Sequence, residues 1–515
     1  MKRLFFCLAV LGVILTGCSK NDDGESDKPN NNGNEQPENP NEPELPELPA
    51  LPDPDDVCSA MDDLNFMAYC YENFDVNKDG KVSVTEANAA KEIYTTSSKW
   101  VSVKGIERFP NIEILSLNGS SITELDLRYN LKLKSISGYS SLLTTVLLPN
   151  TLTSIEKSAF KECASLIEIH FPASLTSIGV NAFYGCSSLT EINFPASLTS
   201  IGGSAFRGCS SLVEIHLSDN LTSIGEYAFS GCSSLTEINF PASLTLIGGS
   251  AFRGCSSLVE IHLSDNLTSI GEYAFSGCSS LTEINFPASL TSIRGFAFSG
   301  CSSLVEIHLP DNLTSIGERA FWSCSSLTEI HLPASLTWIG GSAFSGCSNL
   351  TKINLPDNLT SIGKTAFSGC SSLTEIHFPA SLTSIGEYAF SGCSSLTEIN
   401  LPASLASIGG SAFSGCSSLT EINFPASLTS IGESAFSFCS NLTEIHLPAS
   451  LTSIGEGTFW SCSSLTEVIC YALVPPKLNG FSNSTIENLY VPAESIQAYK
   501  DSSWAIYFKN ILPIE

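Results

Sequence analysis

Oxygen-bearing side chains recur at close intervals in one short stretch of this 515-residue sequence, FDVNKDGKVSVTEA, at residues 74–87. Within a twelve-residue loop they fall at positions 1, 3, 5, 9 and 12, and a glycine falls at position 6. Calcium sites of this kind use oxygen ligands, a sharp turn at the glycine and a bidentate carboxylate at the last position. We therefore predict a calcium site with the ligands Asp75, Asn77, Asp79, Lys81 (through its backbone carbonyl), Ser83 and Glu86.

The segments on either side of this loop have the patterns of two short helices. Before it, MDDLNFMAYCYENF places Leu64, Ala68, Tyr71 and Phe74 near helical spacing, and after it VTEANAAKEIY can form an exit helix. The whole unit resembles an EF-hand, and the alternative is a chance acidic turn. Because the sequence has no second loop of this kind, we expect residues 57–104 to form an EF-hand-like helical cap stabilised by calcium.

The N-terminus has the features of a bacterial export signal. Residues 1–17 combine two basic residues with an apolar run that is too short to span a bilayer. LTGC, which ends at Cys18, resembles a lipobox and implies acylation of that cysteine; the alternative is an ordinary cleaved signal. The following SKNDDGESD resembles the acidic export tag of surface lipoproteins of Gram-negative anaerobes. We expect an outer-membrane lipid anchor, exposure at the cell surface, and membrane contact only through the anchor.

Composition separates a tether from the remainder of the chain and argues against one class of partner. After the cysteine, residues 18–56 are rich in Asn, Pro and Glu and too poor in apolar residues to fold, which predicts a disordered tether. The chain carries 52 acidic and 24 basic residues, a net charge of -28. This balance argues against nucleic acid, whose phosphates require clustered Lys and Arg.

A 23-residue period occupies residues 152–468, after irregular leucine-rich units at residues 105–151 in which ITELDLRYN fits L-x-x-L-x-L-x-x-N. A cysteine recurs from Cys163 to Cys462, and a phenylalanine stands three residues before each one. The segment LTEINF alternates, which predicts a strand with Ile238 facing inward. One copy cannot bury its own apolar side, so the copies must stack, with their strands in a parallel ladder.

These patterns together predict the fold class. We expect an α+β repeat protein, a leucine-rich repeat solenoid of 23-residue coils with a stacked parallel β-ladder, preceded by the helical cap and closed by residues 469–515. The phenylalanines should form a stacked core. The repeated cysteines lack C-x-x-C spacing, and a ladder of equivalent thiols offers no unique disulfide pairing, so we expect free buried cysteines.

All seven histidines share one column, seven residues after the cysteine, where asparagine fills six other places. A glutamate precedes each histidine by two residues. Only His308 and His331 stand on neighbouring coils, with Glu306 and Glu329 beside them. A divalent metal could bridge this group, but a solvated polar face is the favoured interpretation.

A specific partner contact needs a place where the near-identical copies differ, and they differ most around the two neighbouring histidines. Arg319 and Trp322 appear there in GERAFWSC, and Trp338 replaces the usual serine of LTSI. Arg and Trp are enriched at binding hot spots, so we treat Arg319, Trp322, Trp338, His308 and His331 as candidate partner contacts. The alternative is neutral variation at tolerant surface positions.

The repeat, LTSIGEYAFSGCSSLTEINFPAS in its copy at residues 221–243, resembles the BspA-like leucine-rich repeat in its Phe, Cys and Pro columns. The resemblance covers residues 152–468, and the tail LYVPAESIQAYKDSSWAIYFKNILPIE resembles the closing segment of that family. It implies a surface lipoprotein that binds host matrix proteins or other cells. No ligand-contact motif of the family can be carried over to named residues.

The expected function is that of a binding scaffold. No nucleophile–base pair, phosphate loop or inward acid pair stands at a unique position in the sequence, so we do not expect an enzyme. A protein partner on host matrix or a cell surface is the first expectation. The alternative is a glycan-binding or accessory surface lipoprotein of a nutrient-uptake system.

Overall fold

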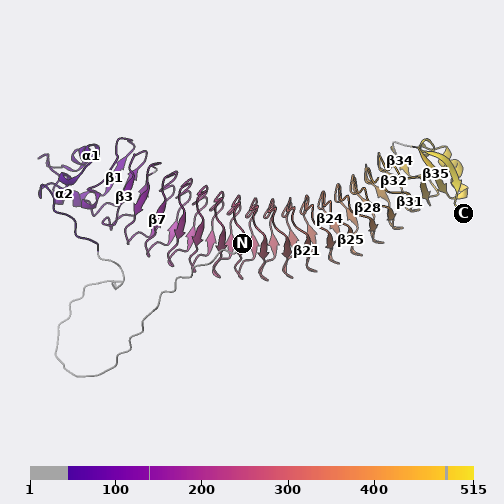
Figure 1. Ribbon diagram of the computed structural model, residues 1–515, viewed down its shortest axis with the longest axis horizontal. Coiled ribbons are helices and arrows are strands. Elements are labelled where there is room, and N and C mark those ends of the chain that lie inside the picture. Colours follow the sequence, from indigo (N-terminus) through magenta and orange to yellow (C-terminus); the bar gives the residue numbers. More distant parts are fainter. Residues whose placement is uncertain (1–44, 139, 482–484, 515) are drawn as a thin grey trace, which may run out of the picture. The chain divides into compact units, whose positions relative to one another are not determined.

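The computed structural model describes residues 45–138, 140–481 and 485–514. The chain divides into two units, Met1–Glu47 and Leu48–Glu515, and the fold below is that of the second. The predicted signal peptide, the predicted acylation site Cys18 and most of the predicted tether lie outside the described residues. In the second unit, coils of chain stack in sequence order from a short helical segment to a closing segment (Figure 1).

Coils of the stack contribute strands to two parallel ladders, which confirms the predicted leucine-rich repeat solenoid. The first, here called the polar ladder, is built mainly from Glu-Ile-His and Glu-Ile-Asn segments. Its strands pair in register, so that Ile238 of one coil lies beside Ile261 of the next. The strands are β3 (Glu124–Asp126), β5 (Thr145–Leu147), β7 (Glu168–His170), β9 (Glu191–Asn193), β11 (Glu214–His216), β13 (Glu237–Asn239), β15 (Glu260–His262), β17 (Glu283–Asn285), β19 (Glu306–His308), β21 (Glu329–His331), β23 (Lys352–Asn354), β25 (Glu375–His377), β27 (Glu398–Asn400), β29 (Glu421–Asn423), β31 (Glu444–Leu447), β33 (Glu467–Cys470), β35 (Ile486–Val491) and β36 (Phe508–Pro513).

The second ladder, here called the short ladder, is built mainly from the Ser-Ile pair of LTSI. The sequence analysis did not predict it, because two residues are too few to show the alternation that identifies a strand. Its strands are β1 (Glu92–Thr95), β2 (Ile114–Leu117), β4 (Ser135–Ser137), β6 (Ser154–Ile155), β8 (Ser177–Ile178), β10 (Ser200–Ile201), β12 (Ser223–Ile224), β14 (Leu246–Ile247), β16 (Ser269–Ile270), β18 (Ser292–Ile293), β20 (Ser315–Ile316), β22 (Trp338–Ile339), β24 (Ser361–Ile362), β26 (Ser384–Ile385), β28 (Ser407–Ile408), β30 (Ser430–Ile431), β32 (Ser453–Ile454) and β34 (Lys477–Leu478).

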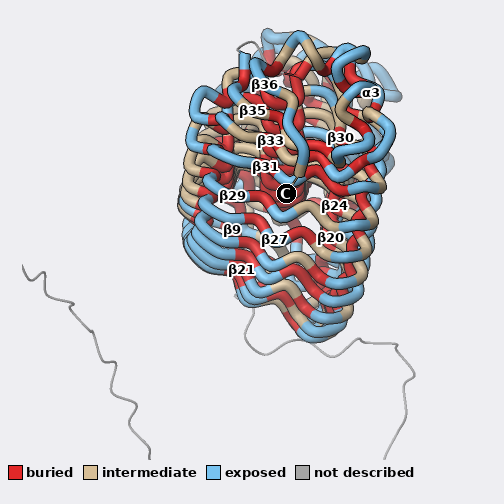
Figure 2. Tube along the Cα trace, turned by 90° about the vertical axis from the view of Figure 1, so that its right-hand side faces the viewer, coloured by how far each residue is buried: buried red, intermediate tan, exposed pale blue. Residues whose placement is uncertain are grey.

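Apolar columns fill the interior of each coil, while polar columns face outward (Figure 2). The predicted phenylalanine stack is confirmed: the rings of Phe183 and Phe206 lie 5.0 Å apart with planes inclined by 5°. The stack continues coil by coil to Phe436 and Phe459, 5.7 Å apart. Ile238 is buried as predicted. The core is therefore continuous across the coils, as the repeat required.

Polar columns of the repeat bond each coil to the one before it. The Thr291 hydroxyl donates to the carbonyl of Thr268 at 3.2 Å, and serine hydroxyls make similar bonds. The buried Cys278 thiol donates to the carbonyl of Phe252 at 3.3 Å, and burial raises its pKa well above the usual range. All cysteines within the described residues are free and buried, as expected for the repeat column. Ser, Thr and Cys recur because each satisfies a backbone carbonyl of the neighbouring coil.

A glycine follows most strands of the short ladder and permits close approach of the coils. A Cβ at Gly225 would lie 2.6 Å from the backbone of Gly202 in the preceding coil. Arg294 takes this place in one coil, and its N–H bonds the carbonyl of Ile270 at 3.3 Å, against 2.9 Å for the corresponding bond of the next coil. The lengthened bond is the expected effect of a side chain where the stack has room only for hydrogen.

Helical segments lie near the two ends of the described stack. They are η1 (Val57–Ala60), α1 (Leu64–Phe74), α2 (Val84–Ala89), η2 (Ile106–Arg108), η3 (Ala493–Ser495), α3 (Ile496–Lys500) and η4 (Ser503–Tyr507). The exit helix α2 is shorter than the pattern VTEANAAKEIY suggested, because β1 pairs with β2 and begins the stack inside the predicted cap. At the far end, β35 and β36 extend the polar ladder, and the buried Tyr499 and Trp504 close the apolar interior.

Candidate functional site

The predicted calcium loop connects α1 to α2. Asp75 directly follows α1, and Ser83 caps the first turn of α2. Ser83 and Glu86 form a capping box, in which the Glu86 carboxylate accepts the Ser83 N–H at 2.9 Å. Gly80 has a φ of +85°, the left-handed conformation that a sharp turn requires. The local sequence thus places the first and last predicted ligands at the ends of two helices.

Backbone N–H groups gather around the carboxylates of this loop. The Asp75 carboxylate accepts the N–H groups of Asp79 at 3.1 Å and Gly80 at 2.9 Å. Glu86 Oε1 accepts the N–H of Val76 at 2.9 Å, so the last predicted ligand closes over the start of the loop. Hydrogen bonds lower the pKa of Glu86, the largest contribution coming from the backbone of its capping partner. The loop therefore holds an ionised carboxylate at neutral pH.

The donor set of the loop fits a hard cation such as calcium. Every predicted side-chain ligand offers oxygen, and Asn77 donates to the Asp79 carboxylate at 2.9 Å. The Lys81 ammonium lies 2.8 Å from Asp53, so this side chain is engaged outside the predicted coordination shell. The Asp75 carboxylate accepts two hydrogen bonds in the loop, which leaves about two of its roughly four acceptor positions for a cation. The Glu86 carboxylate accepts four, from the N–H groups of Val76, Asn77 and Ser83 and from the Ser83 hydroxyl, so calcium binding at Glu86 requires some of these bonds to be exchanged. These residues would hold calcium through oxygen ligands and would supply no further chemistry.

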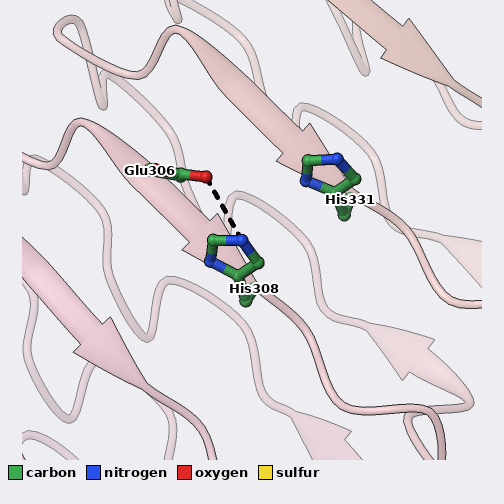
Figure 3. Close-up of side chains that lie close together, drawn as sticks. All are labelled: Glu306, His308 and His331. Atoms are coloured by element: carbon green, nitrogen blue, oxygen red, sulfur yellow. Dashed lines mark ion pairs between the residues drawn. The ribbon is translucent and has the colours of Figure 1, made fainter.

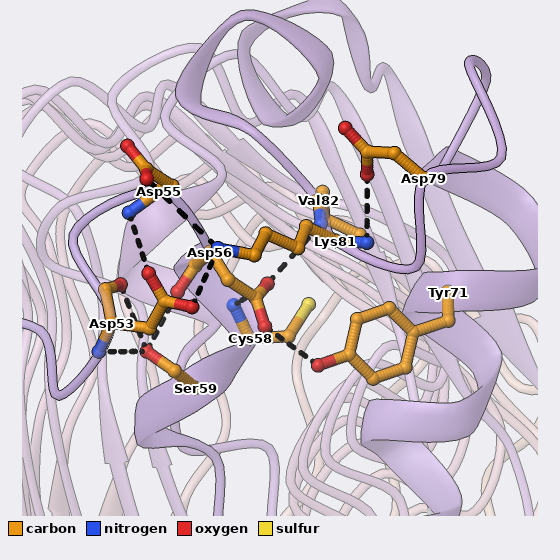
Figure 4. Close-up of polar contacts among 9 residues, drawn as sticks. All are labelled: Asp53, Asp55, Asp56, Cys58, Ser59, Tyr71, Asp79, Lys81 and Val82. Carbon is orange, nitrogen blue, oxygen red and sulfur yellow. Dashed lines mark hydrogen bonds and ion pairs between the residues drawn. The ribbon is translucent and has the colours of Figure 1, made fainter.

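One upstream segment fixes the loop in place (Figure 4). The Val57 N–H bonds the Val82 carbonyl at 2.9 Å, and the Val82 N–H bonds the Asp56 carboxylate at 3.1 Å. The buried Asp56 also accepts the Tyr71 hydroxyl of α1 at 2.7 Å. Both backbone groups of Val82 are thus paired within this chain, so the single loop is held without a second hand.

The helix that enters the loop packs on the first part of the stack. Asp63 caps α1, and its second carboxylate oxygen accepts the N–H of Val101 at 2.6 Å. The ring of Phe74, the last residue of α1, lies 5.3 Å from that of Phe109. Order in the loop is therefore coupled to order at the N-terminal end of the stack.

The five predicted partner contacts occupy three separate parts of the coil. Arg319 and Trp322 lie in the turns between β20 and β21, and Trp338 lies in β22 of the short ladder. His308 and His331 lie side by side on the polar ladder. Both tryptophans are exposed. The structure brings the histidines together and places Arg319 and Trp322 in one turn, but it does not join all five in one site.

Arg319 belongs to a row of exposed and half-buried side chains that the sequence analysis did not predict. The row occupies two columns, two and five residues before the cysteine, where serine is the commonest residue. This aromatic–arginine row consists of Tyr184, Arg207, Tyr227, Arg253, Tyr273, Phe296 and Arg319. Its signal in the sequence is the repeated replacement of serine by Tyr, Phe or Arg in these two columns.

Cation–π and stacking contacts connect members of the row. The Arg207 guanidinium lies 5.8 Å from the ring centre of Tyr184 and 5.2 Å from that of Tyr227. The rings of Tyr273 and Phe296 stack 4.4 Å apart with planes inclined by 14°. The first three residues also line an open hollow, together with glycine backbone of neighbouring coils. The arrangement offers flat apolar faces beside positive charge, in a chain that is otherwise acidic.

The polar ladder presents a histidine–glutamate pair on each histidine-bearing coil. In each pair a ring nitrogen lies 2.7 to 3.4 Å from the carboxylate two residues earlier. All of these side chains are exposed, which confirms the predicted outward polar face. At His308 and His331 two such pairs stand side by side.

The BspA type leucine rich repeat region family matches residues 132–259, 245–374 and 383–505, which together exceed half of the chain. This chain belongs to the BspA-type leucine-rich repeat family. The solved structure of a leucine-rich repeat protein from Bacteroides ovatus is 32% identical, covers 71% of this chain and 88% of that chain, and has a TM-score of 0.54. A T. pallidum leucine rich repeat protein is 34% identical over 31% of this chain and 77% of its own, with a TM-score of 0.30. No curated protein matches.

The solenoid fold of this BspA-type protein determines the kind of surface that it offers to a partner. A repeat solenoid presents an extended surface on which many coils can contact one partner. In the part of the chain that the structure describes, no helix combines the length and the apolar character needed to cross a bilayer. The polar ladder, the aromatic–arginine row and the predicted calcium loop are the features of this solenoid that could contact a partner or an ion.

Proposed function

We propose that this BspA-type protein is a surface-displayed binding scaffold that contacts host matrix proteins or other cells. The proposal includes export, acylation at Cys18 and display at the outer membrane on the tether, which the sequence patterns support. It includes no catalytic step. Its general support is the repeat architecture, because columns that return on every coil suit many weak contacts along one surface.

The aromatic–arginine row is the observation that carries this proposal. Tyr, Trp and Arg supply much of the binding energy at protein interfaces. Tyr227, Tyr273 and Phe296 have φ values of 58°, 57° and 57°. This left-handed backbone costs a residue with a side chain about 1–2 kcal/mol. Serine adopts it in other coils, as at Ser204, so the fold does not require an aromatic side chain there. The backbone conformation is the same for serine and for an aromatic residue in this column, so the rings at these surface positions add nothing that the fold needs, which favours a role in binding.

We also propose that calcium binds Asp75, Asn77, Asp79, Ser83, Glu86 and the Lys81 carbonyl. The ion would hold α1, the loop and α2 together and would stabilise the N-terminal end of the stack. The support is the all-oxygen donor set and the packing of α1 against the first coils.

A binding assay with the detergent-solubilised full chain tests the scaffold proposal against immobilised matrix proteins and a glycan array. The row variant combines Arg207→Ser, Tyr227→Ser, Arg253→Ser and Tyr273→Ser, because serine is common in both columns. We expect the row variant to lose affinity for a protein ligand by about tenfold or more. The matched control is Leu246→Ser, which removes an exposed apolar side chain from the short ladder, introduces the serine that is common in that column and should leave binding unchanged.

Single substitution of Trp322 extends the test to the turn beside Arg319. Trp322 stands two residues before Cys324, in one of the two columns of the row, so Trp322→Ser should weaken binding. Trp338→Ser tests the other predicted tryptophan contact separately, and weaker binding by this variant would add the short ladder to the contact surface. Unchanged binding by the row variant, with thermal stability also unchanged, would contradict the proposal. Binding on the glycan array alone would assign the scaffold to glycans instead of proteins.

A further inference from the structure

Two histidines and one glutamate come together on the polar ladder, apart from the aromatic–arginine row and the calcium loop. Strands β19 and β21 pair in register, so that His308 lies beside His331 and Glu306 beside Glu329. The two imidazole rings stack 5.5 Å apart with planes inclined by 6° (Figure 3). His308 Nε2 lies 3.2 Å from the Glu306 carboxylate.

The ligand atoms of this cluster are close to a metal-binding arrangement. One carboxylate oxygen of Glu306 and one ring nitrogen of each histidine lie within 4.8 Å of one another. Ligand atoms of a tetrahedral zinc ion, with bonds of about 2.0–2.1 Å, lie about 3.3 Å apart. The side chains of Glu306, His308 and His331 are 50%, 69% and 56% exposed, so they can rotate over this difference. The strands need not move.

The chemistry of these atoms selects a class of ion. Imidazole nitrogen suits zinc, copper and nickel, and a carboxylate completes such sites, whereas calcium and magnesium prefer oxygen alone. We propose that Glu306, His308 and His331 bind one divalent transition-metal ion of the zinc class. Water occupies the remaining position, because the site faces solvent. The parallel ladder holds the two histidines in register before the ion arrives.

The rest of the ladder provides internal controls for this assignment. His262 has the same glutamate partner, with Nε2 3.1 Å from Glu260, but it lies beside Asn239 and Asn285. Within residues 45–138, 140–481 and 485–514, no other three His, Cys, Asp or Glu side chains bring ligand atoms within the same distance. A second imidazole in register is thus what distinguishes the proposed site from the isolated pairs.

Zinc titration of the full chain tests the proposal, with saturating calcium present to occupy the calcium loop. The variants His308→Asn and His331→Asn introduce the residue that fills this column in six other coils, so the fold should be retained. We expect each variant to bind zinc more weakly by at least about 10- to 100-fold, the loss seen when a supporting residue of a metal site is removed. His262→Asn is the matched control and should bind zinc like the parent chain.

A variant that adds a zinc site complements the His→Asn variants, because a gain of zinc binding cannot result from misfolding. Asn239 lies in register with His262 and follows Glu237 by two residues, so Asn239→His should create a second zinc site. The proposal would be overturned if the parent chain does not bind zinc, or if His308→Asn binds zinc as tightly as the parent. It would also be overturned if His262→Asn loses as much zinc affinity as His308→Asn. Failure of Asn239→His to add a site would contradict its geometric basis. Circular dichroism of each variant checks that the coils are intact.

Discussion

Replacing Phe298 by alanine should lower the free energy of unfolding sharply in the middle of the stack. Phe298 is fully buried, and its ring stacks 5.4 Å from that of Phe275 and 5.5 Å from that of Phe321. Removing a buried phenylalanine costs about 3–5 kcal/mol, and less where the surroundings collapse into the cavity. Collapse is opposed here, because backbone bonds of 2.8 Å from Phe275 and Phe298 fix the spacing of the coils. We therefore expect a loss of about 4–5 kcal/mol.

The effect of Phe298→Ala should be local, because the stability of a solenoid is approximately a sum over coils and the interfaces between them. Phe298 contributes to two such interfaces. Hydrogen exchange read by mass spectrometry on the full chain reports the free energy of opening coil by coil. We expect faster exchange around Phe298, while coils near Phe183 and Phe413 keep their protection. Denaturant unfolding should show a lower midpoint.

Phe296→Ser is the matched control, since Phe296 lies two residues away, is half-buried and occupies a column in which serine is common. We expect this change to alter the free energy of unfolding by less than about 1 kcal/mol. If Phe298→Ala lowers the free energy of unfolding no more than Phe296→Ser does, the inference that the phenylalanine stack holds the coils together is refuted.

Two substitutions and one labelling experiment test other parts of the protein. Glu86→Gln should abolish calcium binding in calorimetry and fray the first coils, whereas calcium at about 100 times its Kd should stabilise the parent by about 2.7 kcal/mol. Equal calcium affinity in the variant would show that Glu86 is not a ligand. Cys18→Ser should release the protein from the outer-membrane fraction, and retention there would mean that the anchor lies elsewhere. The fourteen repeat cysteines should resist iodoacetamide at about pH 8 in the native chain, since burial raises the pKa of thiols such as Cys232 and excludes the reagent. Mass spectrometry showing rapid native labelling would contradict their burial.

Much of the fold was predictable because the repeat is so regular. A strict 23-residue period with one phenylalanine and one cysteine per copy leaves stacking as the way to bury the apolar side of each copy. Alternation around Ile238 identified the polar ladder, and the structure confirms it. The calcium site stays a prediction, which the sequence permits because all the expected ligands lie within twelve residues. The structure shows the two helices on either side of that loop.

Features that depend on pairing between distant segments were not predictable. Residues 92–94 were predicted to end a helix, yet Glu92–Thr95 forms β1 because Ile114–Leu117 lies beside it. The short ladder has the same origin: two residues show no period, and only the neighbouring coil makes them a strand.

For surface side chains, too, the sequence determines some relations and tertiary packing determines others. Trp322 and Trp338 are close in sequence, yet the coil places them in different parts of its cross-section. Arg207 lies between Tyr184 and Tyr227, although each is about a full coil away along the chain. Spacing within one copy is set by the covalent chain, so ligand intervals and inward-facing columns can be read directly from the residues. Contacts between columns depend on the path of the backbone around each coil, because that path decides which side chains of neighbouring coils lie together. Only tertiary packing fixes the path.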